Sequence, residues 1–417
     1  MNNRVRLLAI WLWGFSLGVI GLVAFLVWST GPSSLRHPIK QSYGLDDKDI
    51  LLYLEAITRI QQSALFLDSH VSRETTIYDT LKAYLGSKDP FSDFLTPKEY
   101  DRVLQAQQDR SLGVGLEIEK TSTGDIMCFP IRNGPAEQAG IRAGDRLKSI
   151  NGALVNGKSL LSIVSLPGAM NQKQVDFVVV TDSGVEKKVR VTRSDAKFEP
   201  VSVILVGKVP IVTLRLFTPK TGEHLKDILN RWQDSQPLIL DLRDNPGGDL
   251  DAAMASANLF LNKGMSILQV VTRTGEQKYL ANADAYRPVP YVYLWQNRAT
   301  ASAAEAFIGS LTENGKGISI GTKSAGKGTK QDIIKLSNGA ALVLTTGYLL
   351  TPRGNDYRGR GLDPTFALAQ EHPETSDYLA KLQEVSRARS DRASAVLSTH
   401  KAPPLRIHSL LPVFMNH

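Results

Sequence analysis

The strongest hydrophobic pattern of the chain lies near its N-terminus, where residues 7–28 form an uncharged run of 22 residues. A helix needs about 20 mostly apolar residues to cross the hydrocarbon core of a bilayer. Arg4 and Arg6 precede the run, and no lysine or arginine follows it until Arg36, an asymmetry that favours a cytoplasmic N-terminus. The pattern predicts a transmembrane signal anchor over residues 1–30.

A cleaved signal peptide is the alternative interpretation of this segment. The apolar core of a signal peptide has about 7–15 residues and is followed by small residues at the cleavage site. Here the apolar core is longer, and residues 27–31 form a poor cleavage site. We therefore expect an uncleaved, single-pass anchor in a bacterial inner membrane, with the rest of the chain in the periplasm.

A helical region is expected over residues 47–110, after a tether over residues 31–46 that contains Pro, Ser and Gly. Its first apolar residues recur at the spacing of one helix face: Ile50, Leu54, Ile57 and Ile60. Residues 96–99, Thr-Pro-Lys-Glu, are typical of a capping box with proline at the first helical position. We expect these helices to be structural.

The pattern changes to short strands over residues 111–195. A strand with two glycines opens the region, residues 134–141 predict a short helix ended by glycine, and residues 144–152 predict a strand that runs into an Asn-Gly turn. This succession resembles a PDZ domain, and a generic small β-domain is the alternative. In PDZ domains a glycine loop turns backbone N–H groups toward the C-terminal carboxylate of a peptide, which adds to the sheet edge. Val114 and Gly115 match that peptide-binding loop.

From residue 196 to residue 370 the pattern is α/β. Residues 237–242 are almost continuously apolar, as expected of a strand buried on both faces. Residues 243–248 then form a sharp glycine-rich turn, which presents free backbone N–H groups. The GxxxxGK[ST] spacing of a phosphate cradle is absent, so we expect the turn to stabilise a developing oxyanion instead.

Two short runs farther along carry the candidate chemistry. Residues 299–305 place a serine among small residues, where a strand over residues 291–295 gives way to a helix predicted over residues 303–311. Residues 326–331 offer a glycine-flanked lysine with an amide side chain four residues later. A serine hydroxyl is a weak nucleophile until a base takes its proton. A lysine becomes such a base when burial or neighbouring charges lower its pKa from about 10.4.

Each of these residues alone has an ordinary interpretation. Ser302 suits a helix N-cap, and most lysines, Lys327 included, are solvated surface groups. The two runs together, in register with the glycine-rich turn, predict a Ser-Lys hydrolase. The histidines favour the same conclusion, since they lie mostly outside the α/β region and no HExxH motif occurs.

Over residues 45–370 the chain resembles the C-terminal processing peptidases, which are also called tail-specific proteases. Seven segments carry the resemblance: residues 89–95, 111–195, 241–248, 299–305, 326–331, 346–352 and 359–364. It implies an α/β multidomain protein in which a crotonase/Clp-like serine protease core, residues 196–370, follows the PDZ domain. The core is expected to need no cofactor and no metal.

The resemblance also assigns roles to residues. Ser302 would be the nucleophile, Lys327 the general base and Gln331 the residue that orients the lysine. Gly247 and Ala303 would supply the N–H groups of an oxyanion hole, with the register between Gly247 and the next glycine left open.

Three departures from the family pattern flank these positions. The family usually has serine where Thr300 and Ala304 stand, and a Thr-Phe pair where residues 324–325 stand. They bear on rate and pocket shape and leave the dyad in place.

Composition narrows the partners and the chemistry. The net charge of +8 suits a surface beside an anionic membrane, and no long Lys/Arg run interleaved with aromatic residues suggests nucleic-acid binding. A single cysteine, Cys128, excludes an internal disulfide framework and a cysteine-rich zinc site.

In the tail, residues 371–417, apolar residues cluster after a helix expected from Ser376. We expect this tail to contact a second protomer or an adaptor, with packing on its own core as the alternative.

The function that these patterns favour is a membrane-anchored periplasmic serine endopeptidase, which cleaves proteins captured by their free C-termini. Two other classes remain. A catalytically weak PDZ scaffold would recruit partners, but intact Ser302, Lys327 and Gln331 weigh against it. A crotonase-like acyl-CoA enzyme would share the oxyanion-hole turn, but the PDZ insertion and the lack of an evident CoA-phosphate site weigh against that.

Overall fold

The computed structural model describes most of the chain beyond the predicted anchor and tether. The described residues are 47–63, 72–108, 111–121, 123–131, 133–164, 166, 172–197, 199–232, 237–286, 292–370 and 373–399. The predicted transmembrane segment lies outside them. Among the helices of the described part, none combines the length and the apolar character needed to cross a bilayer.

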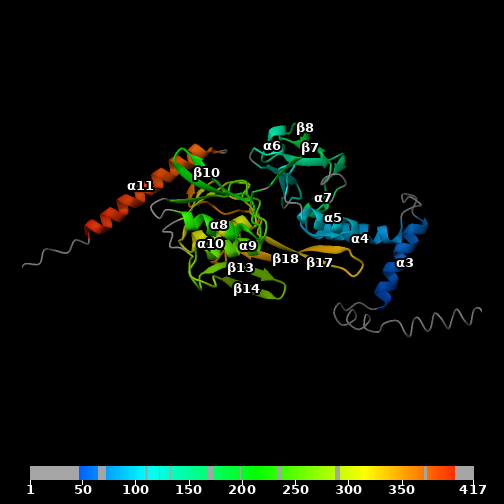
Figure 1. Cartoon of the computed structure of the whole chain (residues 1–417). Coiled ribbons are helices and arrows are strands. Elements are labelled where there is room, and N and C mark those ends of the chain that lie inside the picture. Colours follow the sequence, from blue (N-terminus) through cyan, green and yellow to red (C-terminus); the bar gives the residue numbers. More distant parts are fainter. Residues whose placement is uncertain are drawn as a thin grey trace, which may run out of the picture. The chain divides into compact units, whose positions relative to one another are not determined.

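The chain divides into two compact units, residues 1–80 and residues 81–417. The described part of the first unit contains α3 (Asp47–Ser63) and the beginning of α4 (Arg73–Lys88) (Figure 1). Of the predicted apolar face of α3, Ile57 is 5% exposed, whereas Leu54 and Ile60 are 41% and 43% exposed. The helical pattern is confirmed, but within this unit the apolar face is only partly buried.

The predicted capping box is confirmed at the start of α5 (Pro97–Gln108). The Glu99 carboxylate accepts a hydrogen bond from the Thr96 backbone N–H at 2.8 Å, and the Glu99 N–H donates to the Thr96 hydroxyl at 3.3 Å. These reciprocal bonds satisfy N–H groups that a helix start leaves without partners.

A small β-domain occupies the region that the sequence assigns to a PDZ fold. Its sheet has the order β3-β4-β5-β7-β8, with β6 paired to β5, and α6 and α7 complete it. The bounds are β3 Leu116–Lys120, β4 Ile126–Pro130, β5 Arg146–Ile150, β6 Ala153–Leu154, β7 Gln174–Val180, β8 Glu186–Thr192, α6 Pro135–Ala139 and α7 Leu160–Val164. Strand β3 is the edge of this sheet. A separate pair, β2 (Ser111–Gly113) and β9 (Ser194–Lys197), lies at its two chain ends.

The α/β region is built on a six-stranded sheet with the order β10-β11-β12-β15-β16-β19. All neighbours are parallel except β10 and β11. The bounds are β10 Val201–Val206, β11 Val209–Leu214, β12 Leu238–Asp241, β15 Val292–Gln296, β16 Gly317–Gly321 and β19 Phe366–Ala367. β12 is buried along its whole length, as the apolar run over residues 237–242 predicts.

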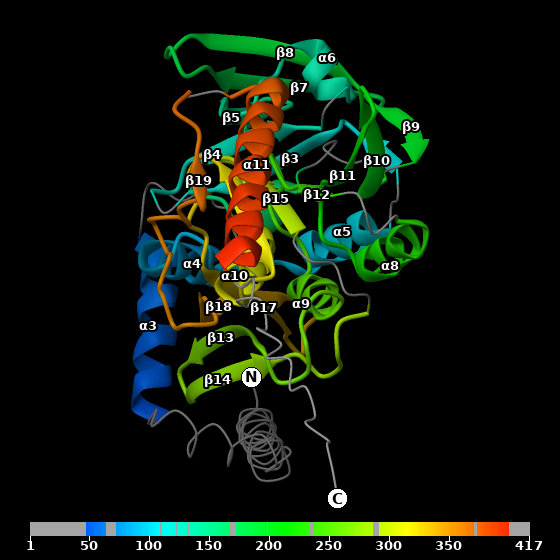
Figure 2. The same ribbon diagram turned by 90° about the vertical axis from the view of Figure 1, so that its left-hand side faces the viewer.

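Helices cover both faces of this sheet. Three helices pack on one face through the largest apolar cluster: α8 Thr221–Arg231, α9 Leu250–Asn258 and α10 Ala303–Glu313. On the other face, Tyr378, Leu382 and Val385 of α11 (Thr375–Thr399) pack against Trp295 and its neighbours. Figure 2 shows α11 lying across the sheet. The first part of the tail therefore folds back on its own core, while residues 400–417 lie outside the described part.

A second sheet of this region has the order β1-β18-β13-β14, with β17 paired to β18. The bounds are β1 Asp93–Leu95, β13 Ser266–Thr272, β14 Gly275–Leu280, β17 Thr329–Lys335 and β18 Ala341–Leu350. Asp93 of β1 also accepts hydrogen bonds from the Ser162 hydroxyl at 2.7 Å and the Ser159 N–H at 3.3 Å. One buried carboxylate thus joins this sheet to α7 of the β-domain.

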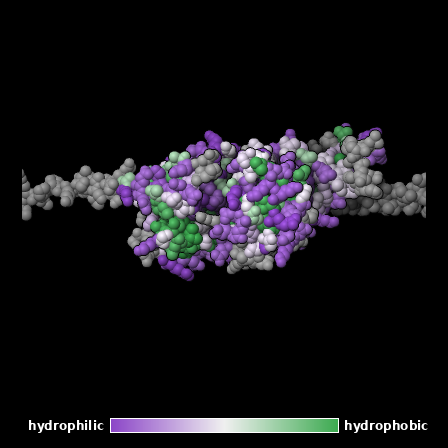
Figure 3. All heavy atoms as spheres, turned by 90° about the horizontal axis from the view of Figure 1, so that it is seen from above, coloured by the Kyte–Doolittle hydropathy of each residue, from purple (hydrophilic) through white to green (hydrophobic). Residues whose placement is uncertain are grey.

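The face drawn in Figure 3 is mostly hydrophilic, with a few separate apolar patches. Among the described residues, Val203 and Leu205 of β10 are 48% and 72% exposed. β10 is an edge strand, so these side chains stand beside unpaired backbone groups.

Candidate active site

Ser302 lies where the chain turns from β15 into α10, as the sequence predicts. Its backbone has φ 56° and ψ −122°, a conformation that a residue with a side chain rarely adopts. The surrounding turn fixes it. The Ala301 N–H donates to the Asn245 carbonyl at 2.9 Å, and the Ser302 N–H donates to Glu305 Oε2 at 2.9 Å. Backbone strain of this kind persists only where neighbouring contacts determine it, and such residues cluster at functional sites.

Thr300 supports the same turn, although the family pattern has serine at this position. Its hydroxyl donates to the Leu242 carbonyl at 2.8 Å and accepts the Asn297 N–H at 2.9 Å. Both bonds use only the hydroxyl, which serine and threonine share. The departure therefore leaves the hydrogen bonding of the turn intact.

The glycine-rich turn after β12 contacts the serine directly. Gly247 has φ 109°, and a Cβ placed there would lie 2.7 Å from Ser302 Cβ and 2.9 Å from Ala303 N. Glycine is required here by the close approach as well as by the backbone angle. The structure thus brings Gly247 against Ser302 and Ala303, which lie 55 and 56 positions later in the sequence.

The N–H groups at this contact are not equivalent. Gly247 is buried, and its N–H donates to Asn245 Oδ1 at 2.8 Å. Gly248 is exposed, and neither its N–H nor that of Ala303 donates to another residue in the described part of the chain. Of the two registers that the sequence leaves open, this geometry favours Gly248 as the oxyanion donor, with Gly247 providing the close approach.

Lys327 forms an ion pair with a carboxylate of the β-domain. Its Nζ lies 2.8 Å from Oε2 and 3.2 Å from Oε1 of Glu119 on β3, and both side chains are only 14% exposed. Burial raises the pKa of Glu119, and the Lys327 charge opposes that rise. The proposed base is therefore engaged by a carboxylate of the β-domain and makes no hydrogen bond to Ser302.

Gln331 also has partners other than the lysine. Its Nε2 donates to the hydroxyl of Thr329 at 2.9 Å and to that of Thr345 at 3.2 Å. The orienting contact between Gln331 and Lys327 is therefore not formed in this structure. Both side chains would need to change partners to form the arrangement that the resemblance implies.

Glu305, which the sequence patterns above do not single out, joins the segments of Ser302 and Lys327. It is fully buried, and Oε2 accepts the backbone N–H groups of Ser302 at 2.9 Å and Lys327 at 2.8 Å. Oε1 accepts the Gly326 N–H at 2.7 Å and the Ser324 hydroxyl at 2.6 Å. Burial raises the pKa of Glu305 to about 7, and these four hydrogen bonds oppose the rise. The Ser-x-x-Glu spacing of residues 302–305 is a capping-box signal that could have identified it.

The predicted carboxylate loop lies between β2 and β3. Gly115 has φ 62°, and a Cβ there would lie 2.7 Å from Pro135 Cδ, so glycine is required. Within the described residues, neither the Val114 nor the Gly115 N–H donates a backbone or side-chain hydrogen bond. These two N–H groups lie next to the edge strand β3, which pairs only with β4 among the described strands.

Among the described residues there is no group of three or more His, Cys, Asp or Glu side chains placed to hold a metal ion. Cys128 is buried in the core of the β-domain, which raises its pKa above the usual thiol range. Neither finding adds a chemical group to the serine site.

Taken together, the fold and the site define an α/β protein with a strained serine at a helix start, a glycine turn against it and a β-domain whose carboxylate engages the nearby lysine. Residues 208–368 match peptidase family S41, and residues 130–181 match the PDZ domain. Parts of the chain are therefore similar to S41 peptidases and to PDZ domains.

The curated relatives described next are named as serine proteases. A "Probable CtpA-like serine protease" from Staphylococcus aureus (strain COL) is 31% identical over 281 residues, 66% of this chain and 56% of the relative. A protein of the same name from Staphylococcus epidermidis is 27% identical over 86% of this chain and 74% of its own length. The chain thus spans little more than half the length of the first of these relatives.

Among solved structures, the photosystem II D1 C-terminal processing protease matches with a TM-score of 0.61 and 26% identity. The match covers 76% of this chain and 92% of that one. The chain has the fold of a C-terminal processing protease.

Proposed function

We propose that the protein is a serine endopeptidase in which Ser302 is the nucleophile and Lys327 the general base. One observation carries the proposal: a single oxygen, Oε2 of Glu305, accepts the backbone N–H groups of both residues. The main chains of the two residues are therefore held at one point, beside the glycine turn. A lysine side chain released from Glu119 would start from a backbone already fixed next to the serine.

The chemistry follows from these positions. Neutral Lys327 takes the Ser302 proton as the hydroxyl oxygen attacks a peptide carbonyl, and the glycine turn and the Ala303 N–H hold the resulting oxyanion. One such donor typically contributes about 2.7–4 kcal/mol to transition-state stabilisation. The protonated lysine then gives its proton to the leaving amine, and water hydrolyses the acyl-enzyme. Gln331 would orient the lysine once both have left their present partners.

Substrates in this proposal are proteins with a free, apolar C-terminus. Val114 and Gly115 would bind the terminal carboxylate, and the substrate chain would add to the free edge of β3. The processing protease with the similar fold supports this, since its name states C-terminal processing.

Cellular location and assembly complete the proposal. Residues 7–28 would anchor the chain in a bacterial inner membrane, with the peptidase in the periplasm, and the tail beyond residue 399 would contact a second protomer or an adaptor. Protease added to spheroplasts should then degrade the domain. Truncation after Thr399 should change the number of chains per particle, as calculated from the mass measured by light scattering. A new N-terminus near residue 31 in a soluble fraction would contradict the anchor, and an unchanged number of chains with unchanged activity would contradict the assembly role.

Casein digestion tests the central proposal. The wild-type chain should cleave casein, whereas Ser302→Ala and Lys327→Ala should each lower the rate by at least about a thousandfold, because the two residues act as one unit. The thermal midpoints of both variants should stay close to that of the wild type. Cleavage by Lys327→Ala at the wild-type rate would exclude it as the base.

The ion pair between Lys327 and Glu119 favours one alternative, a catalytically weak PDZ scaffold that recruits partners. Such a scaffold would bind peptides with free C-termini and leave them intact under all conditions. Peptide binding by the wild type without cleavage would support this alternative and contradict the peptidase proposal.

A further inference from the structure

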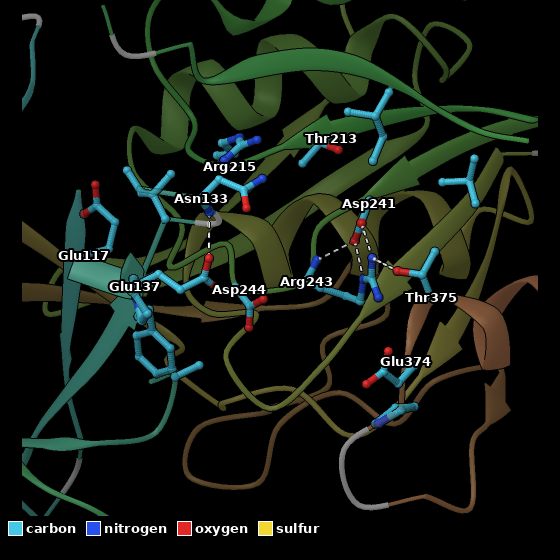
Figure 4. A pocket seen from close by; sticks show the side chains of 17 residues that line it. Glu117, Asn133, Glu137, Thr213, Arg215, Asp241, Arg243, Asp244, Glu374 and Thr375 are labelled. Carbon is cyan, nitrogen blue, oxygen red and sulfur yellow. Dashed lines mark hydrogen bonds and ion pairs between the residues drawn. The ribbon is translucent and has the colours of Figure 1, made fainter. Parts of the chain in front are cut away.

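A cavity of about 620 Å³ lies between the PDZ domain, the six-stranded sheet and the start of α11, and most of its charged side chains are acidic. We call it the acidic pocket. Five carboxylates line it: Glu117, Glu137, Asp241, Asp244 and Glu374. Figure 4 shows these side chains arranged around the hollow together with Arg215 and Arg243. A chain with a net charge of +8 thus lines one cavity with five acidic groups against two basic ones.

One of the two guanidinium groups is already neutralised. Arg243 binds both oxygens of Asp241, at 2.8 Å from Nε and 2.6 Å from Nη2. Its guanidinium also lies 5.0 Å from the ring centroid of Trp295 and 4.7 Å from that of Tyr378. This arginine is fixed in the wall and cannot offset the remaining carboxylates.

Glu117 is the carboxylate that most needs a partner. It lies on β3 two residues before Glu119, so the alternation of a strand places both on one face. Glu119 is paired with Lys327, whereas Glu117 has no hydrogen bond or ion pair with any described residue. Burial, with the nearby charge of Glu119, raises the pKa of Glu117 to about 7. A partly buried carboxylate without a cation is unfavourable, and a cation beside it would stabilise its charged form.

The rest of the lining suits a long, flexible cation. Phe129, Ile131, Ile204 and Val206 provide an apolar wall. Lysine and arginine side chains bury their methylene stems on such surfaces and keep the charged end at polar groups. The described residues offer no cluster suited to a metal ion, which leaves an organic cation as the fitting occupant.

Two hydrogen bonds join the pocket to the turn that precedes the serine. The Asp244 N–H donates to Asn297 Oδ1 at 3.0 Å, and Asn297 Nδ2 donates to Asp244 Oδ1 at 2.8 Å. Asp244 begins the turn that carries Gly247, and Asn297 begins the turn that carries Ser302. A side chain bound in the pocket would therefore sit at a fixed position relative to the nucleophile.

We propose that the acidic pocket is a specificity subsite that receives one Lys or Arg side chain of the substrate. This inference rests on the proposed peptidase function, because it assumes that a peptide lies between the PDZ domain and Ser302. The subsite selects substrates with a basic residue at one defined distance from the cleaved bond.

Binding tests the subsite without requiring catalysis. The probes are fluorescent ten-residue alanine-based peptides with a free C-terminus and one arginine at successive positions, each paired with its citrulline counterpart, which has nearly the same shape but no charge. The full chain with Ser302→Ala should bind the arginine peptide about tenfold more tightly at one position, and 0.5 M salt should reduce that preference, because the pocket's charges are partly open to ions. Equal affinity for arginine and citrulline at every position would overturn the proposal.

Variants locate the preference in the pocket. Glu117→Gln and, separately, Glu374→Gln in the Ser302→Ala chain should each reduce the arginine preference at least threefold. Glu276 is an exposed carboxylate on β14, and Glu276→Gln should leave the arginine preference unchanged. Glu374 is exposed, so its substitution keeps the test valid if Glu117→Gln lowers the thermal midpoint. A preference that survives in both pocket variants would contradict the assignment.

Cleavage by the wild-type chain separates this proposal from the proposed function. Cleavage of arginine and citrulline peptides with equal kcat/KM, together with equal binding, would leave the peptidase in place and overturn the subsite. Binding with an arginine preference but without cleavage of any peptide would support the subsite and overturn the peptidase proposal.

Discussion

The Nζ of Lys327 lies 2.8 Å from Oε2 of Glu119, a residue 208 positions earlier in the chain. The candidate base, in the region that matches peptidase family S41, is thus bound to the edge strand of the β-domain. A displacement of β3 would break this contact and free the lysine, which leads to the first prediction.

Glu119→Gln should raise the basal rate of peptide hydrolysis about fivefold at limiting substrate, a change within the usual range of couplings between two sites. The amide keeps the shape of the side chain and removes the charge that holds Lys327. Initial rates on a quenched peptide measure the effect, with Glu276→Gln as the control on an exposed strand. A rate at or below that of the wild type would show that the ion pair does not restrain the base.

Glu305→Gln should abolish activity and destabilise the α/β region. Glutamine offers one oxygen where the native side chain offers two, and its NH₂ group would face N–H donors that now point at a carboxylate. A buried N–H group left without an acceptor costs about 1–3 kcal/mol, so a loss of a few kcal/mol in the free energy of unfolding is expected. Denaturant unfolding measures it, with Glu223→Gln on the exposed side of α8 as the control. Unchanged stability would contradict the role given to Glu305.

The free energy of unfolding should fall as the pH rises from about 4.5 to about 7. In the folded chain the pKa of Glu305 is raised from 4.5 to about 7, so the folded state binds more protons than the unfolded state in that window. The stabilisation is complete below pH 4.5 and lost above pH 7, and it amounts to about 3 kcal/mol for a shift of this size. Glu117, with its pKa also raised to about 7, adds in the same direction.

Urea unfolding at pH 5 and pH 8 would measure this difference. Carboxylates with lowered pKa values, such as Glu99 and Asp356, change stability below pH 4.5 and leave the window clear. Equal stability at the two pH values would show that Glu305 is ionised throughout, held by its four hydrogen bonds.

Gly247→Ala should remove activity by displacing the serine. The new methyl carbon would lie 2.7 Å from Ser302 Cβ, and both positions are fixed by buried turns. Gly264→Ala is the matched control, because Gly264 also has a positive φ, 84°, but no heavy atom within 4 Å of an added Cβ. Both variants should lose some stability through the backbone angle, while only Gly247→Ala should lose hydrolysis. Similar loss of activity in both variants would contradict a specific contact.

Amidation of a substrate's C-terminus should reduce its cleavage at limiting concentration. The N–H groups of Val114 and Gly115 would bind a carboxylate, and the amide removes its charge and one acceptor oxygen. Comparison of kcat/KM for acid and amide forms of one apolar-ended peptide measures the effect, which should appear in KM rather than kcat. Equal values would leave the PDZ domain without a role in binding the terminus.

Much of the fold follows from local patterns in the sequence. The apolar run over residues 237–242 contains β12, the small residues after Thr300 begin α10, and the capping box at Thr96 begins α5. Each of these signals acts within a few residues, so one segment contains both the cause and the structure. For the same reason Ser302 could be placed at a helix start from sequence alone.

The partners of the site residues could not be predicted in this way. The Glu119–Lys327 pair and the contact of Gly247 with Ser302 depend on how separate elements pack, and no local pattern records a partner 208 residues away. Glu305 is different. Its capping-box spacing was present in the sequence, but only the structure shows that the same carboxylate also holds the lysine segment.

The positive φ of Ser302 implies a conflict at this position between the stability of the fold and the proposed reaction of the hydroxyl. A glycine accepts φ 56° without the penalty that a Cβ imposes, and its N–H would still bond to Glu305. Replacement by glycine would therefore relax the chain at the very residue whose hydroxyl is proposed to react. On this view, natural selection for stability alone would drive the position away from serine, and only selection for the hydroxyl would keep it there.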